Sequence, residues 1–389
     1  MKYLIFLLVA CSLSACKTPA KPQPEEVTDL FEKYNLYEAD ALVIDAFANS
    51  DVVLIGENHF IAEHVTFVAD LIPTLHANGV NILYSEFISV DYTPLIEEVI
   101  NAEHFDEQKA KNLLLLNLWD WPYKEYMDLY RSAWEVNRSI TDGPKFRIIG
   151  LDRPHNYSVM QTPEDWDDPE KRKAFFVDWE DSWAERVLSE TVEKNEKALV
   201  YCGINHAFTF YNQPILDEDG TFYRMAARDR VGQYLFDALG ERCSMLSFHI
   251  PWDSKDGETE ISVNPLNGRL DQLTDSLSDN QKSYGFYTQT SPLGKVIDSN
   301  GFYANGYPNF NLAQFCDGYV VPSKVCDLTM CEFIPNFIDS TNIDIIRPQV
   351  KAWHGIENIG ADQANHMLEE SHRNRIDYYD RNKEKMRCM

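Results

Sequence analysis

The chain has 389 residues, of which 62 are acidic and 35 are lysine or arginine, so its formal net charge at pH 7 is −27. Hydrophobic residues make up 44% of the sequence and aromatic residues 13%. This composition excludes a disordered or collagen-like chain, and the strong negative charge excludes binding to nucleic acids. The length is sufficient for two domains or for one large α/β domain with insertions.

The N-terminal residues have the pattern of a bacterial export signal. An apolar run follows a lysine and is much shorter than the roughly 20 residues needed to span a bilayer. The run leads to residues 13–16, Leu-Ser-Ala-Cys, which resemble the lipobox of bacterial lipoproteins, in which the cysteine is lipidated. The sequence therefore predicts a signal peptide over residues 1–15, lipidation of Cys16, and a flexible tether over residues 16–27.

The predicted location is the bacterial cell envelope, with the lipid bilayer as a partner through the anchor at Cys16. Lys17 stands where an inner-membrane retention signal usually has aspartate, and this favours the outer membrane. Because the acidic chain repels anionic headgroups, only the anchor is expected to hold it at the membrane.

The remaining cysteines are interpreted as structural. Apart from Cys11 and Cys16, they are Cys202, Cys243, Cys316, Cys326, Cys331 and Cys388. An oxidising compartment permits disulfides between them, and their spacing fixes no single pairing. Their sequence also lacks the CxxC or Cys-His spacing that is typical of a zinc site.

From residue 51, short apolar runs rich in β-branched residues alternate with longer segments of helical periodicity. Strands are predicted at residues 52–55, 81–84, 146–149, 198–201, 244–248 and 317–321. Helices are predicted at residues 62–76, 93–116, 122–138, 169–195, 229–239 and 361–386. This β-α-β repetition is typical of an α/β fold with a mostly parallel central sheet, helices on both faces and a functional edge at the C-terminal ends of the strands.

The same pattern predicts the domain organisation. An α/β domain is expected over residues 28–335, followed by a C-terminal helical extension over residues 336–389. Residues 252–280 are rich in Asp, Ser, Asn and Gly and have little periodicity, so an insertion or lid is predicted within residues 252–290. A small β-hairpin is the alternative for this segment.

Polar side chains follow four of the predicted strands, at the edge where an open parallel sheet binds its ligands. They are Glu57 and His59 after the first strand, Glu86 after the second, Asp152 and Arg153 after the third, and His206 after the fourth. Imidazoles and carboxylates at one edge suit a divalent metal, or a general base with a carboxylate that orients it. Arg153 is expected either to pair with Asp152 or to hold a substrate carboxylate or oxyanion.

Both histidines end the same short motif, and this recurrence is the strongest functional signal in the sequence. Residues 56–59, Gly-Glu-Asn-His, and residues 203–206, Gly-Ile-Asn-His, each place a glycine where the chain leaves a strand. We expect a positive φ at each glycine, which would turn the histidine back over the strand ends. The sequence lacks GxSxG, Walker and HExxH motifs and glycine-rich dinucleotide-binding turns, so serine hydrolases, NTPases and dehydrogenases are disfavoured.

The paired Gly-x-x-His motifs, with Glu86 at the end of the second strand, resemble the Tiki/TraB-like superfamily. This superfamily includes metal-dependent membrane-tethered proteases, ChaN-like haem-binding uptake lipoproteins and erythromycin esterase-like hydrolases. Residues 54–59, 149–152, 291–294 and 315–319 are similar to segments of the superfamily, so the resemblance extends over residues 51–321.

The resemblance implies that His59, Glu86 and His206 occupy metal-binding or catalytic positions, with Glu57 beside them. A metallohydrolase would hold Mn, Co or Zn there and activate a water molecule, with Glu57 or Glu86 taking its proton. An esterase-like site needs no metal, and His59 is then the general base, oriented by a glutamate. Both imply hydrolysis of an ester or amide bond in a small-molecule or peptide substrate.

The ChaN-like branch implies a different function, which is haem binding and iron uptake without catalysis. Tyrosine or histidine side chains would then be the iron ligands. A non-catalytic envelope protein that keeps the fold is a further alternative. Two other features are interpreted as core: His64, and an aromatic cluster formed by Trp119, Trp121, Tyr123, Tyr126 and Trp134.

Overall fold

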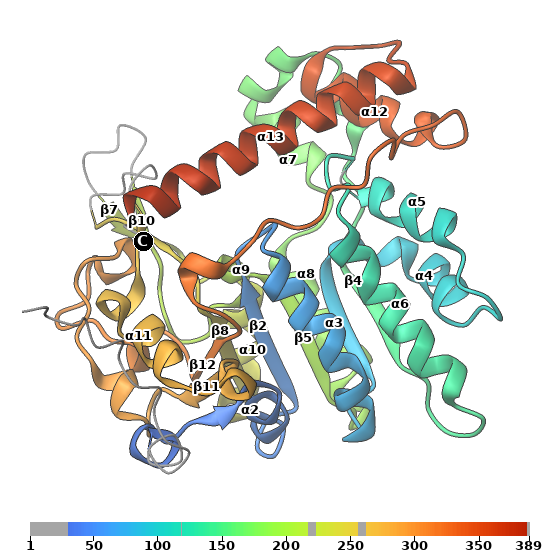
Figure 1. Ribbon diagram of the computed structural model, residues 1–389. Coiled ribbons are helices and arrows are strands. Elements are labelled where there is room, and N and C mark those ends of the chain that lie inside the picture. The colour runs from blue at the N-terminus through green and yellow to red at the C-terminus, as the bar shows by residue number, and fades with distance from the viewer. Residues whose placement is uncertain (1–29, 118, 217–222, 256–261, 387–389) are drawn as a thin grey trace, which may run out of the picture.

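A computed structural model describes residues 30–117, 119–216, 223–255 and 262–386, and the fold is organised around one eight-stranded sheet (Figure 1). The strand order is β1-β11-β12-β8-β2-β5-β3-β4. These strands are β1 (Tyr37–Glu38), β2 (Val52–Glu57), β3 (Ile82–Ser89), β4 (Arg147–Asp152), β5 (Ala198–Gly203), β8 (Cys243–Phe248), β11 (Tyr284–Tyr287) and β12 (Gly318–Val321). The predicted signal peptide and tether, including Cys16, lie outside the described residues.

The six strands from β12 to β4 run parallel, as the sequence predicts, and the antiparallel strands β11 and β1 extend one edge. Every residue of β2 and β5 is buried, because helices cover both faces of the sheet. The strands β2, β5, β3 and β4 are consecutive in the sheet, so the ends that carry the predicted site residues are neighbours.

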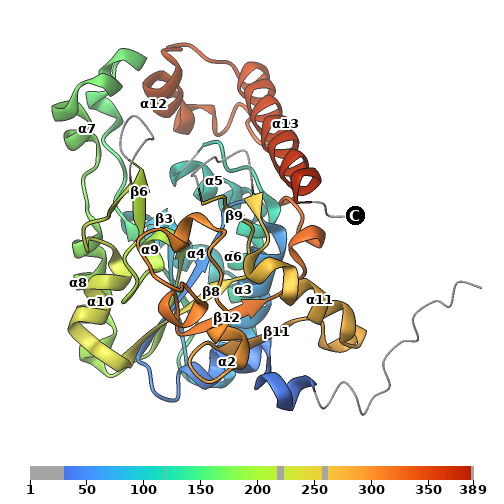
Figure 2. The ribbon, with the colours of Figure 1, turned by 90° about the vertical axis from the view of Figure 1, so that its left-hand side faces the viewer.

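Helices on both faces complete the α/β layers (Figure 2). They are α2 (Ala39–Ala46), α3 (Ala62–Ala77), α4 (Thr93–Ile100), α5 (Glu107–Asn117), α6 (Lys124–Ser139), α7 (Pro169–Phe175), α8 (Glu180–Glu190), α9 (Ile204–Ala207), α10 (Val231–Leu239), α11 (Arg269–Ser276), α12 (Ile343–His354) and α13 (Ala361–Lys385). The contacts between α2, α3 and α6 place these helices on one face, and α8 packs with α10 on the other.

Two helices that the periodicity predicts as continuous are interrupted. The predicted helix over residues 93–116 is divided into α4 and α5, because Asp106 accepts a hydrogen bond from the backbone N–H of Lys109 (3.0 Å) and starts a new helix. The predicted helix over residues 169–195 is divided into α7 and α8. Between them, Asp178 forms a nearly buried ion pair with Arg186 (2.8 Å), and this pair holds the connecting segment in a non-helical conformation.

The segment predicted as an insertion or lid contains a short antiparallel pair, β9 (Trp252–Asp253) with β10 (Ser262–Val263), followed by α11. A second short pair is formed by β6 (Pro214–Leu216) and β7 (Tyr223–Met225). In the C-terminal part, α13 extends from α12 toward β10 across the edge where the parallel strands end (Figure 1). Within the described parts of the chain, none of the helices combines the length and hydrophobicity required to cross a bilayer.

Four of the cysteines in the described ranges, Cys202, Cys243, Cys316 and Cys331, are buried free thiols. Cys326 is disulfide-bonded.

Candidate functional site

The site starts at the C-terminal end of β2, where Glu57 orients His59. Glu57 is buried, and its Oε1 lies 2.8 Å from Nδ1 of His59. The hydroxyl of Tyr126 donates to the same oxygen (2.8 Å), and the hydroxyl of Tyr201 donates to Oε2. Because an ionised carboxylate only accepts hydrogen bonds, this arrangement places the proton of His59 on Nδ1 and leaves the lone pair on Nε2.

The electrostatics of this pair favour a strong base. Burial raises the pKa of Glu57, and the hydrogen bonds from His59, Tyr201 and Tyr126 oppose that rise. Burial acts to lower the pKa of His59, but the hydrogen bond and negative charge of Glu57 outweigh it, so the pKa of His59 is raised. The imidazole therefore gains basicity from a carboxylate that is itself fixed by two tyrosines.

Aromatic rings surround the exposed part of His59, whose side chain is 38% exposed. The ring of Trp121 meets it edge-on with centroids 5.1 Å apart, and the ring of Phe87 does so at 5.8 Å. Phe60 follows His59 in an unusual conformation, with a φ of 70°. The backbone carbonyl oxygen of Phe60 accepts a hydrogen bond from the N–H of Cys331 (2.8 Å). This bond holds the turn that carries the imidazole of His59.

A second histidine lies in an ion-pair network beside the first. Nε2 of His206, in α9, lies 3.3 Å from Oε1 of Glu86, and its Nδ1 lies 3.0 Å from Oε1 of Glu180. Glu86 also accepts a hydrogen bond from the backbone N–H of Gly203 (2.7 Å). Glu180 pairs in addition with Arg230 (3.0 Å), so both carboxylates are held in place.

These contacts make His206 a cation. Burial acts to lower its pKa, but the charges of Glu86 and Glu180 outweigh burial and raise the pKa of His206 to about 10. Burial acts in the opposite direction on Glu86, yet the charge of His206 lowers the pKa of this carboxyl to about 2. At neutral pH His206 is therefore an imidazolium that contributes positive charge to the site.

The glycine of each Gly-x-x-His motif lies against a residue of the other motif, but neither glycine has the φ angle that the sequence predicts. The predicted positive φ is wrong for Gly203, whose φ is −57°, and Gly56 also lies outside the positive-φ region. Both are needed for close approach instead. A Cβ atom on Gly203 would lie 2.8 Å from Cε1 of His59, and one on Gly56 would lie 2.9 Å from Cα of Ile204.

Asp152 and Arg153 lie at the end of β4, at the periphery of this arrangement. Asp152 accepts a hydrogen bond from the backbone N–H of Arg153 (2.7 Å), and burial raises its pKa to about 6. The side chain of Arg153 is exposed, and it forms no ion pair with any residue in the described ranges, Asp152 included. The structure thus brings Glu57, His59, Glu86 and His206 together around Gly203 and leaves the Arg153 side chain outside.

The donor set does not fit a divalent metal. In the part of the chain that the structure describes, no three His, Cys, Asp or Glu side chains are arranged to hold a metal ion. The reason is visible in the contacts of His206, because both of its ring nitrogens face carboxylates. An imidazolium offers no lone pair to a metal.

Three residues of the site are missed by sequence reasoning. Tyr126 belongs to the cluster interpreted as core, Tyr201 lies inside an apolar strand, and Glu180 lies in a charged helical segment. The one available signal is that a tyrosine in a buried strand needs a hydrogen-bond partner, which Glu57 provides for Tyr201. The interpretation of His64 as a core residue agrees with the structure, since His64 is fully buried and stacks on Phe248 with ring centroids 4.4 Å apart.

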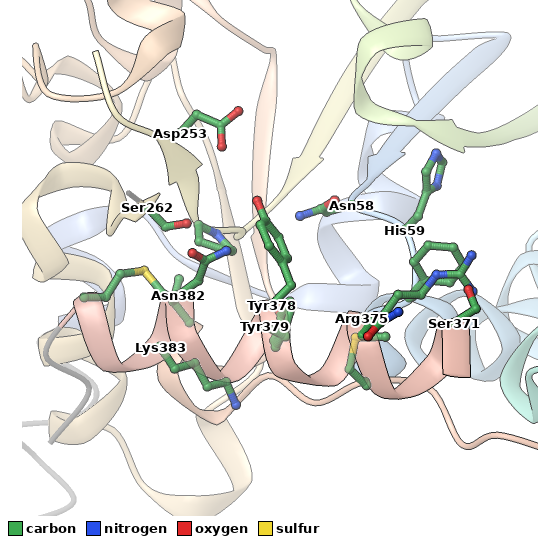
Figure 3. Close-up of a pocket in the computed structure, with 16 residues that line it drawn as sticks. Asn58, His59, Asp253, Ser262, Ser371, Arg375, Tyr378, Tyr379, Asn382 and Lys383 are labelled. Carbon is green, nitrogen blue, oxygen red and sulfur yellow. The ribbon is translucent and has the colours of Figure 1, made fainter. Parts of the chain in front are cut away.

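His59 opens into a cavity of about 470 Å³ that lies between the strand ends and α13 (Figure 3). The turn after β2 contributes Asn58 and His59 to one wall. The pair β9–β10 contributes Asp253 and Ser262, and α13 contributes the opposite wall, including Tyr378. The cavity is the space in which a substrate could contact Nε2 of His59.

Comparison with known proteins confirms the predicted superfamily resemblance. Residues 43–177 match the family model described as haem-binding uptake, Tiki superfamily, ChaN. The matched segment contains Glu57, His59, Glu86 and Asp152, whereas His206 lies beyond it. Comparison with curated proteins gives no match.

Among the three similar solved structures described next, the first, with a TM-score above 0.5, supports the α/β fold. A succinoglycan biosynthesis protein is 12% identical, with a TM-score of 0.52, and the alignment covers 80% of this chain and 98% of that one. A variant of the erythromycin esterase EreC in its open conformation is 11% identical over 75% of this chain and 94% of that one, with a TM-score of 0.46. ChaN of Campylobacter jejuni with cofacially bound haem is 14% identical over 54% and 85%, with a TM-score of 0.33.

Proposed function

We propose, with the resemblance to the Tiki superfamily as the premise, that the chain is a hydrolase of ester or amide bonds. In this proposal it is attached to the bacterial cell envelope through the lipid on Cys16. The observation that carries the proposal is the hydrogen bond between Glu57 and Nδ1 of His59, which leaves the lone pair of Nε2 free of this carboxylate in a residue that lines the cavity. This geometry is that of a general base with an orienting carboxylate.

The residues of the site have separate roles in the proposed reaction. Nε2 of His59 takes a proton from a water molecule, whose oxygen attacks the carbonyl carbon of the substrate. The carboxylate of Glu57 stabilises the imidazolium that forms, while Tyr126 and Tyr201 keep Glu57 in place. His206 holds Glu86 in place beside His59 through their ion pair, and His59 returns its proton to the leaving group.

We expect Glu57→Gln to lower kcat for nitrophenyl ester hydrolysis about tenfold or more, because glutamine cannot stabilise the imidazolium of His59. Glu57 acts as a positioning residue, so the pH profile is the decisive measurement. Only neutral His59 is a base, and Glu57 raises its pKa. The acid limb of kcat/KM should therefore move to lower pH in the variant.

A matched control for this prediction is Glu135→Gln, which changes an exposed glutamate of α6 in the same way. It should leave both kcat and the pH profile unchanged. If Glu57→Gln lowered kcat without moving the acid limb, Glu57 would be a structural residue rather than the partner of a general base. If the unmodified protein hydrolysed none of a panel of esters and amides, the proposed function would be wrong.

Haem binding is the second candidate, and the observation that favours it is the family match over residues 43–177. The cavity also presents an imidazole, His59, and a phenol, Tyr378, which are side chains of the types that ligate haem iron. Titration of the protein with haemin should then produce a Soret band that saturates at a fixed stoichiometry and weakens in Tyr378→Phe. A spectrum equal to that of free haemin at every concentration would contradict this candidate.

A further inference from the structure

We propose that the cavity beside His59 binds the saccharide part of the substrate, so that the scissile bond is an ester on a carbohydrate. This inference rests on the proposed hydrolase function and specifies its substrate class. The cavity is continuous with the catalytic site, because Asn58, His59 and Phe60 line it directly. A group bound in it would therefore place an attached ester within reach of His59.

Several uncharged polar side chains line the cavity (Figure 3). The side chains of Asn58, Ser262 and Asn382 accept or donate no hydrogen bond within the described ranges, and Asn382 is only 6% exposed. The buried hydroxyl of Tyr379 is also without a partner among the described residues. An unsatisfied buried hydroxyl such as that of Tyr379 is costly, and the amides of Asn58 and Asn382 can both donate and accept, so these groups suit a ligand that also donates and accepts hydrogen bonds.

The charges around the cavity favour an uncharged ligand. Its cations are already engaged, since Arg375 pairs with Asp120 (2.6 Å) and Lys383 donates to the carbonyl oxygen of Leu328. Asp253 adds a carboxylate that accepts no hydrogen bond from any described residue. A phosphate or carboxylate ligand would therefore be repelled by Asp253 and would compete with the present contacts of Arg375 and Lys383, whereas a sugar hydroxyl can donate to Asp253.

Aromatic and apolar side chains supply the remaining surface. Phe60 lies beside His59 and is covered on one face by the guanidinium of Arg375, 4.2 Å from the ring centroid. Tyr378 and Tyr379 line the wall that α13 contributes. Amides and hydroxyls interspersed with aromatic surface match a saccharide ring, which presents hydroxyls at its rim and C–H groups on its faces.

The kinetic test compares two acetyl esters in the exported chain carrying Cys16→Ser. We expect Asn382→Leu to raise KM for a methyl glycoside that carries one acetyl ester and three free hydroxyls about tenfold, which corresponds to one lost hydrogen bond, and to leave kcat nearly unchanged. KM for nitrophenyl acetate should not change, because this small ester does not fill the cavity. Arg373→Leu, an exposed position on α13 outside the cavity, is the matched control and should affect neither substrate.

A binding measurement separates this inference from the proposed function. Saturation-transfer NMR with methyl glucoside, galactoside and xyloside should detect binding to the unmodified protein and to His59→Ala, and a weaker signal in Asn382→Leu. Saccharide binding without hydrolysis of any ester would overturn the hydrolase function and retain the saccharide site. Hydrolysis of nitrophenyl acetate with no glycoside signal and no preference for the glycoside ester would overturn the saccharide site and retain the hydrolase.

Discussion

His59→Ala should lower kcat for ester hydrolysis by about 10²- to 10⁴-fold, the usual contribution of a general base. The side chain is partly exposed and packs against aromatic neighbours through its ring edges, so its removal should change the free energy of unfolding little. The variant should therefore keep the thermal unfolding midpoint of the unmodified protein. Steady-state kinetics together with thermal unfolding followed by circular dichroism would test both expectations.

Gly203→Ala should also lower kcat for ester hydrolysis, through displacement of His59 rather than its removal. Its new methyl group would lie 2.8 Å from Cε1 of His59, so the imidazole must move away from its present position. A displacement of this kind should reduce kcat by up to about 10²-fold without removing the base. His104→Ala, at an exposed position far from the strand ends, is the control and should be fully active. Full activity in His59→Ala would exclude the mechanism.

His64→Phe should make the protein more resistant to acid than the unmodified chain. His64 is fully buried, lies in the first turn of α3 and stacks on Phe248 with an interplanar angle of 5°. Burial lowers the pKa of His64 from 6.5 to about 3. The partial positive charge at the N-terminus of α3 also disfavours a protonated histidine at this position. Phenylalanine has a similar shape and no charge to take up, so it suits this position at every pH.

The sign of this effect follows from proton binding. Between pH 6.5 and pH 3 the unfolded chain binds a proton at His64 and the folded chain does not, so acid favours unfolding. At pH 5 the residue should lower the free energy of unfolding by about 2 kcal/mol relative to pH 8. Urea unfolding at both pH values should show this loss in the unmodified protein but not in His64→Phe. His104→Phe, at an exposed position, should behave like the unmodified protein, and parallel pH curves for all three would refute the assignment.

Much of the fold follows from the sequence because a strand that is buried on both faces of a sheet consists of a continuous run of apolar residues. The apolar runs ending at Glu57 and Gly203 predict two parallel strands, which bring His59 and His206 to one edge, and the structure shows that these two strands are neighbours. The short strands β1 and β11 carry no such run, and their antiparallel pairing depends on contacts between distant segments. The divided helices escape prediction because periodicity does not register a local cap such as Asp106.

The chemistry of the site is less predictable than its location. The sequence predicts that Glu57, His59, Glu86 and His206 are close together, but not which carboxylate contacts which imidazole. The assignment of His206 to metal binding required a neutral imidazole ring. Glu180, the first residue of α8, contacts this ring and helps to make it a cation. The role of Tyr201 depends on side-chain direction within the sheet, which the amino-acid order leaves open.

The position of α13 also affects when the molecule becomes competent to bind. His59 and Glu57 are brought together by a local turn, but the opposite wall of the cavity comes from residues such as Asn382, far downstream in the chain. Contacts between such distant residues are expected to form later than a local turn. In the exported hydrolase proposed above, a chain that emerges N-terminus first would thus carry Glu57 and His59 before it could retain a substrate, and this order would delay hydrolysis until α13 has folded against the cavity.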